Sequence, residues 1–384
     1  MKRLICILIS TLLLLSGCTA APEKPPENET AQISAVWIFY SELSMLNEKY
    51  KDEKTFTAKI AEMLDNCVEW GINTVFLQVR PFSDSFYESD IFPWSYYLTG
   101  EQGKSVKYDP LEICINLAHE RNISLHAWIN PFRISFDNDL SKLSDNHPAR
   151  DWIEQKTADV VFVNDGIYYS PASLSVQRLV IDGVREIVKN YDVDGVHIDD
   201  YFYPSTDKSV DSEYYSQYRE SGGKLKLDEW RMNVISAFVS ELYTAVKSED
   251  SDCIFSVSPA GNIRNNYEQQ YADVKLWCSR RGYADWIIPQ LYFGFENETL
   301  PFDKALKEWS NLNTIGAVRM IYGIAAYKVN DSDKEWQAGE GIINKQLDLL
   351  SNTDNCYGVA FFSYSSLADA KRREEFQNLP SIGP

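Results

Sequence analysis

Short apolar runs alternate with longer amphipathic stretches from residue 33 to the end of the chain. The short runs are rich in β-branched and aromatic residues, which is typical of buried strands. The longer stretches repeat apolar residues at helical spacing, and Val176, Val180, Val184 and Ile187 make the clearest stripe. We therefore expect strands near 33–40, 73–80, 124–131, 194–201, 253–259, 284–293, 319–327 and 356–364. Helices are expected near 54–70, 109–121, 175–191, 228–248, 267–281, 302–312, 341–352 and 368–378.

Eight strand–helix units with near-continuous apolar strands indicate a parallel sheet covered by helices. The fold class predicted is α/β, a (β/α)8 TIM barrel with long loops after its strands. An open doubly wound sheet is the alternative. That fold usually has a glycine-rich turn after its first strand, whereas Ser41-Glu42-Leu43 follows the first strand here.

Three long segments, 81–108, 132–174 and 202–226, each follow an expected strand. Loops in this position build the active-site face of a barrel. The middle segment contains two apolar runs, 160–163 and 166–169, that predict a small hairpin.

The first 32 residues predict export rather than fold. Residues 1–17 have a basic start and a short apolar run, as in a signal peptide. Leu15-Ser16-Gly17-Cys18 resembles a lipobox, so we expect lipidation of Cys18 and residues 18–32 to form a flexible linker. An ordinary signal peptide with a chance cysteine is the alternative. Residues 33–384 remain as the barrel, and the expected location is the extracytoplasmic face of the cell membrane.

The formal net charge of −19 makes nucleic acid an improbable partner, because an acidic surface repels phosphate. A neutral polymer such as a glycan is not disfavoured. The chain has no GxSxG, Walker or CxxC motif, and its four histidines show no metal-ligand spacing. We predict neither a cofactor nor a metal ion.

The expected strand at 194–201 contains the main candidates for catalytic residues. Alternation directs Val196 and Ile198 towards the helices and His197 and Asp199 towards the barrel axis. Asp199 and Asp200 stand where the strand ends, and one of two adjacent carboxyls can hold a proton near neutral pH. Such a pair suits glycoside cleavage, although an aspartate pair can also cap a loop or hold a cation. His197 either orients Asp199 or is a core histidine with satisfied nitrogens.

Polar and aromatic residues at the other strand ends suit a sugar, because rings stack on its C–H faces and polar groups bond its hydroxyls. Some of these rings can equally be barrel packing. The predicted substrate-binding residues are Gln78, Arg80, Trp128, Asn130, Arg133, His197, Tyr201, Gln290 and Tyr292.

Several motifs resemble the glycosyl hydrolase-like family ten, a group of (β/α)8 lipoproteins. They include GINTVFLQVRP at 71–81, HAWINPFR at 126–133 and VDGVHIDDYFYP at 193–204, and the resemblance runs through residues 33–367. It implies a glycosidase barrel, export, and action on cell-envelope glycan, including peptidoglycan strands.

The strand at 194–201 is also distantly similar to the DGxDxDxE strand of chitinases. Tyr201 stands where the acid glutamate of that motif would be. The acid could therefore be Asp200, or a carboxyl from another loop such as Asp273 or Glu296. The first hypothesis is a glycoside hydrolase of an envelope polysaccharide. The alternatives are a catalytically inactive glycan-binding lipoprotein and, with less support, a metal-dependent deacetylase.

Overall fold

The computed structural model describes residues 32–312, 318–337 and 341–376. The expected signal peptide at 1–17, Cys18 and all of the linker except Gln32 lie outside the described residues. Within the described ranges, no helix combines the length and apolar character needed to cross a bilayer.

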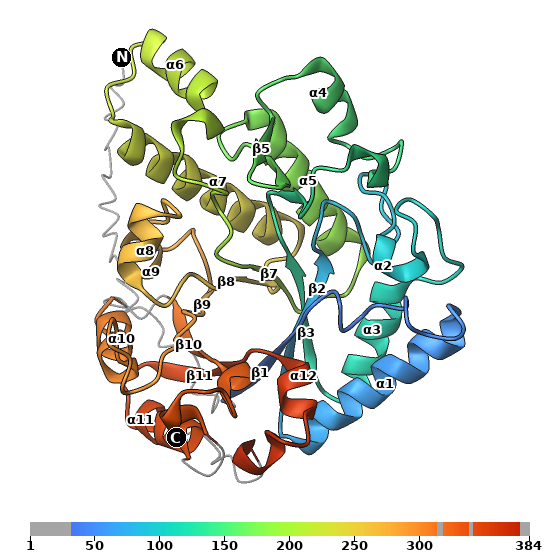
Figure 1. Ribbon diagram of the computed structural model, residues 1–384, viewed down its shortest axis with the longest axis vertical. Helices are drawn as coiled ribbons and strands as arrows, with labels where there is room; N and C mark the ends of the chain where they lie inside the picture. The colour runs from blue at the N-terminus through green and yellow to red at the C-terminus, as the bar shows by residue number, and fades with distance from the viewer. Residues whose placement is uncertain (1–31, 313–317, 338–340, 377–384) are drawn as a thin grey trace, which may run out of the picture. The chain divides into compact units, whose positions relative to one another are not determined.

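Eight parallel strands close into a barrel, and they follow one another around it in chain order (Figure 1). The prediction of a (β/α)8 barrel is confirmed. Each strand pairs with the strand before it and the strand after it, and the last pairs with the first, as in Ile33 opposite Gly358. The strands are β1 Ile33–Ile38, β2 Thr74–Arg80, β3 Ser124–Ile129, β7 Gly195–Ile198, β8 Ile254–Val257, β9 Trp286–Ile287, β10 Arg319–Ile324 and β11 Cys356–Phe361.

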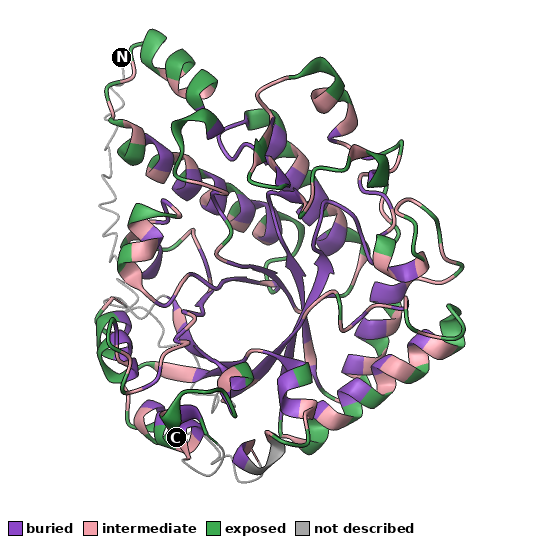
Figure 2. Ribbon diagram, in the orientation of Figure 1, coloured by how far each residue is buried: buried purple, intermediate pink, exposed green. Residues whose placement is uncertain are grey.

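Amphipathic helices surround the barrel, with their buried faces towards the strands and their exposed faces outward (Figure 2). Asp52 and Ser173 cap α1 and α5, because each side chain accepts a hydrogen bond from a first-turn N–H. The longer helices are α1 Glu53–Glu69, α3 Pro110–His119, α5 Leu174–Asn190, α7 Leu227–Glu249, α10 Phe302–Ser310 and α11 Ile342–Ser351.

The long loops contain structure of their own. The loop after β2 contains α2 (Tyr96–Thr99), and the loop after β7 contains α6 (Ser212–Glu220). The loop after β3 contains α4 (Arg150–Gln155) and a small sheet of β4 (Arg133–Ser135), β5 (Val160–Val163) and β6 (Gly166–Tyr169). Strands β5 and β6 pair antiparallel, which confirms the predicted hairpin.

Two expected helices are broken in the structure. The segment expected as one helix at 267–281 forms α8 (Ile263–Glu268) and α9 (Val274–Ser279), separated by Tyr271 at φ 54°. The last expected helix forms α12 (Tyr364–Ala368) and a 3-10 turn at Arg373–Phe376. In the first of these segments the positive φ of Tyr271 interrupts the helix, and the apolar pattern alone does not reveal it.

Strand β9 is shorter than the pattern at 284–293 predicted. Pro289 has no N–H to give to the ladder, so regular pairing stops at Ile287. Gln290 nevertheless forms isolated bridges to Ala260 and Gly323 on either side. Its side chain is thereby fixed at the carboxyl rim of the barrel.

Aromatic and apolar side chains fill the barrel interior. Phe76 lies 4.4 Å from the ring of His197, and His126 stacks on Trp286 at 4.8 Å. Val196 and Ile198 instead join the outer core against the helices, as alternation predicted. This packed interior closes the bottom of the space at the carboxyl ends of the strands.

Candidate active site

A cavity of about 280 Å³ opens at the carboxyl ends of the barrel strands. Asp199 and Asp200 lie together in its wall. Its other lining residues are Trp37, Phe39, Tyr40, Gln78, Trp128, Arg133, Tyr201, Ser258, Gln290, Tyr292, Tyr327 and Phe362. The cavity thus combines two carboxyl groups with an aromatic wall, and its size suits a sugar ring.

Asp199 directly follows β7 and is only 4% exposed. Burial, with Asp200 beside it, raises the pKa of Asp199 to about 7. The positive charge of Arg133 and hydrogen bonds from the Tyr201 backbone and Asn130 oppose this rise. Near neutral pH this carboxyl therefore exists in both its protonated and its ionised form.

Asp200 is half-buried, and burial raises its pKa as well. The Gln290 side chain hydrogen-bonds to Asp200 and opposes this rise, as does the charge of Arg133. Gln290 also donates from Nε2 to the Ser258 carbonyl oxygen at 2.9 Å, which fixes its orientation. The adjacent carboxyls therefore differ in environment: the charge of Asp200 raises the pKa of Asp199, whereas the hydrogen bond from Gln290 lowers the pKa of Asp200.

Asn130 connects Asp199 to the loop after β3. Its Nδ2 atom lies 3.3 Å from each carboxylate oxygen of Asp199, and its Oδ1 accepts from the Arg133 N–H at 3.1 Å. Asn130 is 1% exposed and is not among the residues that line the cavity. It was predicted to bind substrate, but the structure gives it contacts that position Asp199 and Arg133.

Arg133 lies between the two acids and the aromatic rim. Its guanidinium stands 4.2 Å from the centre of the Tyr201 ring and 4.6 Å from that of Phe136. Trp128 lines the cavity from β3, and its Nε1–H has no hydrogen-bond partner in the described part of the chain. A buried donor without a partner is costly unless a ligand or water supplies an acceptor.

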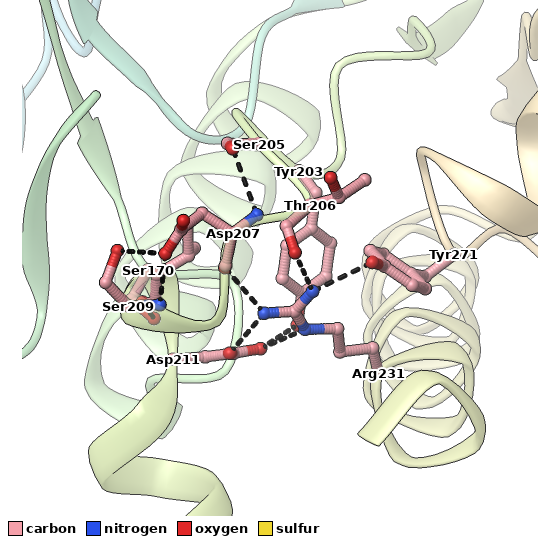
Figure 3. A network of polar contacts seen from close by, with 10 residues as sticks. Ser170, Tyr203, Ser205, Thr206, Asp207, Ser209, Asp211, Arg231 and Tyr271 are labelled. Carbon is pink, nitrogen blue, oxygen red and sulfur yellow. Dashed lines mark hydrogen bonds and ion pairs between the residues drawn. The ribbon is translucent and has the colours of Figure 1, made fainter. Parts of the chain in front are cut away.

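A buried network holds the loop that follows Asp200 (Figure 3). Arg231 on α7 donates to both carboxylate oxygens of Asp211, at 2.7 and 2.6 Å. It also donates to the carbonyl oxygens of Thr206 and Asp207 and to the Tyr271 hydroxyl. Because the loop starts immediately after the two acids, this network fixes the chain that leads away from them.

His197 is a core histidine in the structure. It is fully buried, and burial lowers its pKa well below the usual value, so the ring is neutral. Its Nε2 accepts from Trp37 Nε1–H at 3.0 Å, which places the ring proton on Nδ1, beside Ser256 Oγ at 2.8 Å. His197 is not among the residues that line the cavity.

Arg80 also lies away from the cavity, although it was predicted to bind substrate. The register of β2 against β3 shifts between Gln78 and Arg80, which turns the arginine from the lumen towards the helices. Its guanidinium lies 4.4 Å from the Phe92 ring and beneath α5, where a side chain on Gly183 would collide with it. Gln78, before the shift, lines the cavity.

Asp273 and Glu296, the other candidate acids, are not among the lining residues. Asp273 caps α9 by accepting from the Leu276 N–H at 3.1 Å, and it also bonds to the Tyr267 hydroxyl. Glu296 is exposed in the loop after β9. Of the carboxyl groups in the described residues, Asp199 and Asp200 are those that line this cavity.

Among the lining residues absent from the predicted substrate-binding set, four aromatic ones belong to the first and last strands and the residues that follow them: Trp37, Phe39, Tyr40 and Phe362. They come from the ends of β1 and β11, which close the barrel next to each other. The alternation of Trp37 and Phe39 in the first expected strand could have indicated them. No comparable polar motif drew attention to those two strands.

Comparison with known proteins agrees with this arrangement. The profile of the glycosyl hydrolase-like 10 family matches residues 32–338. The chain belongs to that family. It is 32% identical to Glycosyl hydrolase YngK of Bacillus subtilis (strain 168), over 92% of this chain and 73% of that protein. It is 30% identical to Glycosyl hydrolase DigH of Escherichia coli (strain K12), over 97% of this chain and 93% of that protein.

The fold of this glycosyl hydrolase-like 10 protein also resembles solved structures. The PgaB (BpsB) glycoside hydrolase domain from Bordetella bronchiseptica superposes with a TM-score of 0.63 at 11% identity, over 92% of this chain and 99% of that domain. At such low identity the likeness concerns the fold alone. The resemblance recognised in the sequence motifs is confirmed by the family match. The described residues contain no group of three or more His, Cys, Asp or Glu side chains that could hold a metal ion.

Proposed function

We propose that this protein hydrolyses glycosidic bonds in a polysaccharide of the bacterial cell envelope, with peptidoglycan glycan strands as the first candidate substrate. The observation that carries the proposal is the Asp199–Asp200 pair inside a sugar-sized, aromatic-walled cavity at the barrel rim. The names of the relatives support hydrolysis as the reaction class.

The unequal environments of the two acids suggest their roles. Protonated Asp199 donates its proton to the glycosidic oxygen as the bond from that oxygen to the anomeric carbon breaks. Asp200, as a carboxylate, stabilises the positive charge that develops on the sugar. Water then forms the new bond to the anomeric carbon, and its proton passes to the Asp199 carboxylate, which restores the acid. Arg133 limits the build-up of negative charge when both acids are ionised.

The direct test incubates the purified protein with peptidoglycan and a panel of soluble polysaccharides and measures new reducing ends. We expect release by the wild type and a loss of roughly a hundredfold or more in Asp199→Asn, since a positioned acid contributes about 10²–10⁴ in rate. Asp273→Asn is a suitable control, because its carboxyl caps α9 outside the cavity. Full activity in Asp199→Asn would remove this residue from the mechanism.

A second candidate function is glycan binding without turnover. The observation that favours it is that both lining carboxyls come from one strand end and are adjacent in the chain. A glycosidase usually places its two carboxyls on opposite sides of the bond, about 5–10 Å apart. Saturable binding of a glycan with no release of reducing ends, unchanged in Asp199→Asn, would support this alternative.

We also propose export and lipid anchoring through Cys18, which rests on the amino-acid pattern of residues 1–18. Fractionation of bacteria that express the full chain should recover it with the membrane, labelled by a radioactive fatty acid. Cys18→Ala should lose the label. Equal labelling of both forms would contradict anchoring at this cysteine.

A further inference from the structure

A second hollow of about 310 Å³ lies beside the active-site cavity, between the loops that follow β2 and β3. Phe82, Tyr96 and Tyr97 line it from the first loop. Ile134, Ser135 and Phe136 line it from the second. We name this the loop hollow.

The loop hollow and the active-site cavity share a wall. Tyr40 lines the cavity, and its ring lies 4.6 Å from that of Tyr97 and 4.9 Å from that of Phe82 in the loop hollow. On the other side, Arg133 lines the cavity and stacks on Phe136 of the loop hollow at 4.6 Å. The two sites are therefore neighbours, separated by one layer of side chains.

Exposed aromatic rings gather at these two sites. Tyr96 and Phe136, in the loop hollow, are 46% and 53% exposed. Tyr201 and Tyr327, in the cavity, are 53% and 41% exposed. In the described part of the chain, the other exposed aromatic side chains are Tyr50 and Phe162. Rings exposed to this extent present apolar surface to a ligand.

The loop hollow also contains a buried acid. Asp84 lines it and is 1% exposed, and its Oδ1 has no hydrogen-bond partner among the described residues. Burial raises the pKa of Asp84 to about 6, against the hydrogen bonds that Ser95 and Gln102 provide. A buried oxygen without a partner is costly unless a ligand or water supplies a donor.

We propose that the loop hollow is a second sugar subsite, which binds a further unit of the same glycan chain whose bond is cleaved in the cavity. Tyr96 and Phe136 stack on the C–H faces of that unit, and Asp84 accepts a hydrogen bond from one of its hydroxyls. This inference rests on the proposed function, because the occupant is a continuation of that substrate.

Binding by Asp199→Asn protein separates this inference from catalysis. The probes are soluble glycan strands from purified peptidoglycan, divided into short and long fragments, with affinity measured by calorimetry. We expect long fragments to bind more tightly than short ones. Tyr96→Ala and Phe136→Ala, each made in Asp199→Asn, should reduce this advantage by roughly three- to tenfold, the range for one lost ring contact. Phe162→Ala is the matched control, because Phe162 is also 53% exposed but lies in neither site.

Each result decides the inference. An advantage of long fragments that depends on Tyr96 and Phe136 supports it, even if the wild type cleaves nothing and the proposed hydrolysis is wrong. Hydrolysis by the wild type, together with equal binding of long fragments by all variants, would overturn the subsite and leave the enzyme intact. Absence of any binding by Asp199→Asn would overturn it as well.

Discussion

Two buried charged clusters flank the same stretch of chain, and they are built in opposite ways. Asp211 is matched by Arg231, and their side chains are fully buried with two hydrogen bonds between them. Asp199, twelve residues earlier, has a second carboxyl beside it and long bonds of 3.3 Å from Asn130. The first cluster holds its charges in a single arrangement. In the second cluster, Asp199 has a pKa of about 7, so it gains and loses its proton near neutral pH.

The difference between the two clusters shows that the residues that stabilise the fold are not those proposed to take part in the reaction. A buried acid that is paired with a buried counter-charge and fully hydrogen-bonded serves the fold, because removal of either partner is strongly destabilising. A buried acid that lacks such a partner takes up a proton near neutral pH, which costs stability and provides a general acid. The Arg231 network anchors the loop that starts after the reactive pair, through Thr206, Asp207 and Asp211 (Figure 3). The loop is therefore held although Asp199 and Asp200 repel each other when both are ionised.

The largest effect is expected from breaking the matched cluster. Arg231→Met should destabilise the protein by about 3–5 kcal/mol, because Asp211 would remain buried without a counter-charge. Urea unfolding at neutral pH would measure this loss. The control is Arg264→Met, which removes an ion pair to Glu268 of 2.8 Å on the surface and should change little. Equal effects of the two substitutions would contradict the structural role of the Arg231–Asp211 pair.

Removing the charge of Asp199 should stabilise the protein, in contrast to the loss of stability expected for Arg231→Met. The pKa of Asp199 is about 7 in the folded protein, against the ordinary value of 3.8. Between these values the folded state holds a proton that the unfolded state has released. The wild type should therefore lose stability as pH rises from about 4 to about 7, with the full penalty above that range.

Asp199→Asn removes this penalty, because an amide does not ionise. At about pH 8 it should be more stable than the wild type by on the order of 1–3 kcal/mol, and the gain should disappear near pH 4. Thermal unfolding followed at several pH values would measure both the gain in stability at about pH 8 and its disappearance near pH 4. A variant that is less stable than the wild type at pH 8 would show that Asp199 is adequately paired.

The barrel was predictable from the sequence, because its strands and helices carry regular apolar patterns. Asp199 and Asp200 were predictable too, since charge at the end of an apolar strand needs an explanation. The inward side of β2 was predicted correctly for Gln78 and incorrectly for Arg80. A bulge reverses alternation at that point, and nothing in the residue types announces it.

The sequence pattern did not predict the contacts between segments that lie far apart in the chain. The bonds that hold His197 come from Trp37, Ser256 and Ser258 on other strands, so its satisfied state could be stated only as an alternative. Asp273 was a candidate acid as a carboxyl that another loop could bring to the cavity. The break at Tyr271 makes Asp273 a cap instead.

The smallest effect concerns how Asn130 tunes the reactive pair. Its Nδ2 donates to Asp199 and favours the ionised carboxylate, so Asn130→Ala should raise the pKa of Asp199 by about one unit or less. If Asp199 is the general acid, activity falls as pH rises through its pKa, and the alkaline limb of the pH–rate profile should move to higher pH. Ser256→Ala serves as a control, because Ser256 is also buried in the barrel but bonds to His197. A limb that stays in place in Asn130→Ala, or moves to lower pH, would assign that titration to another group.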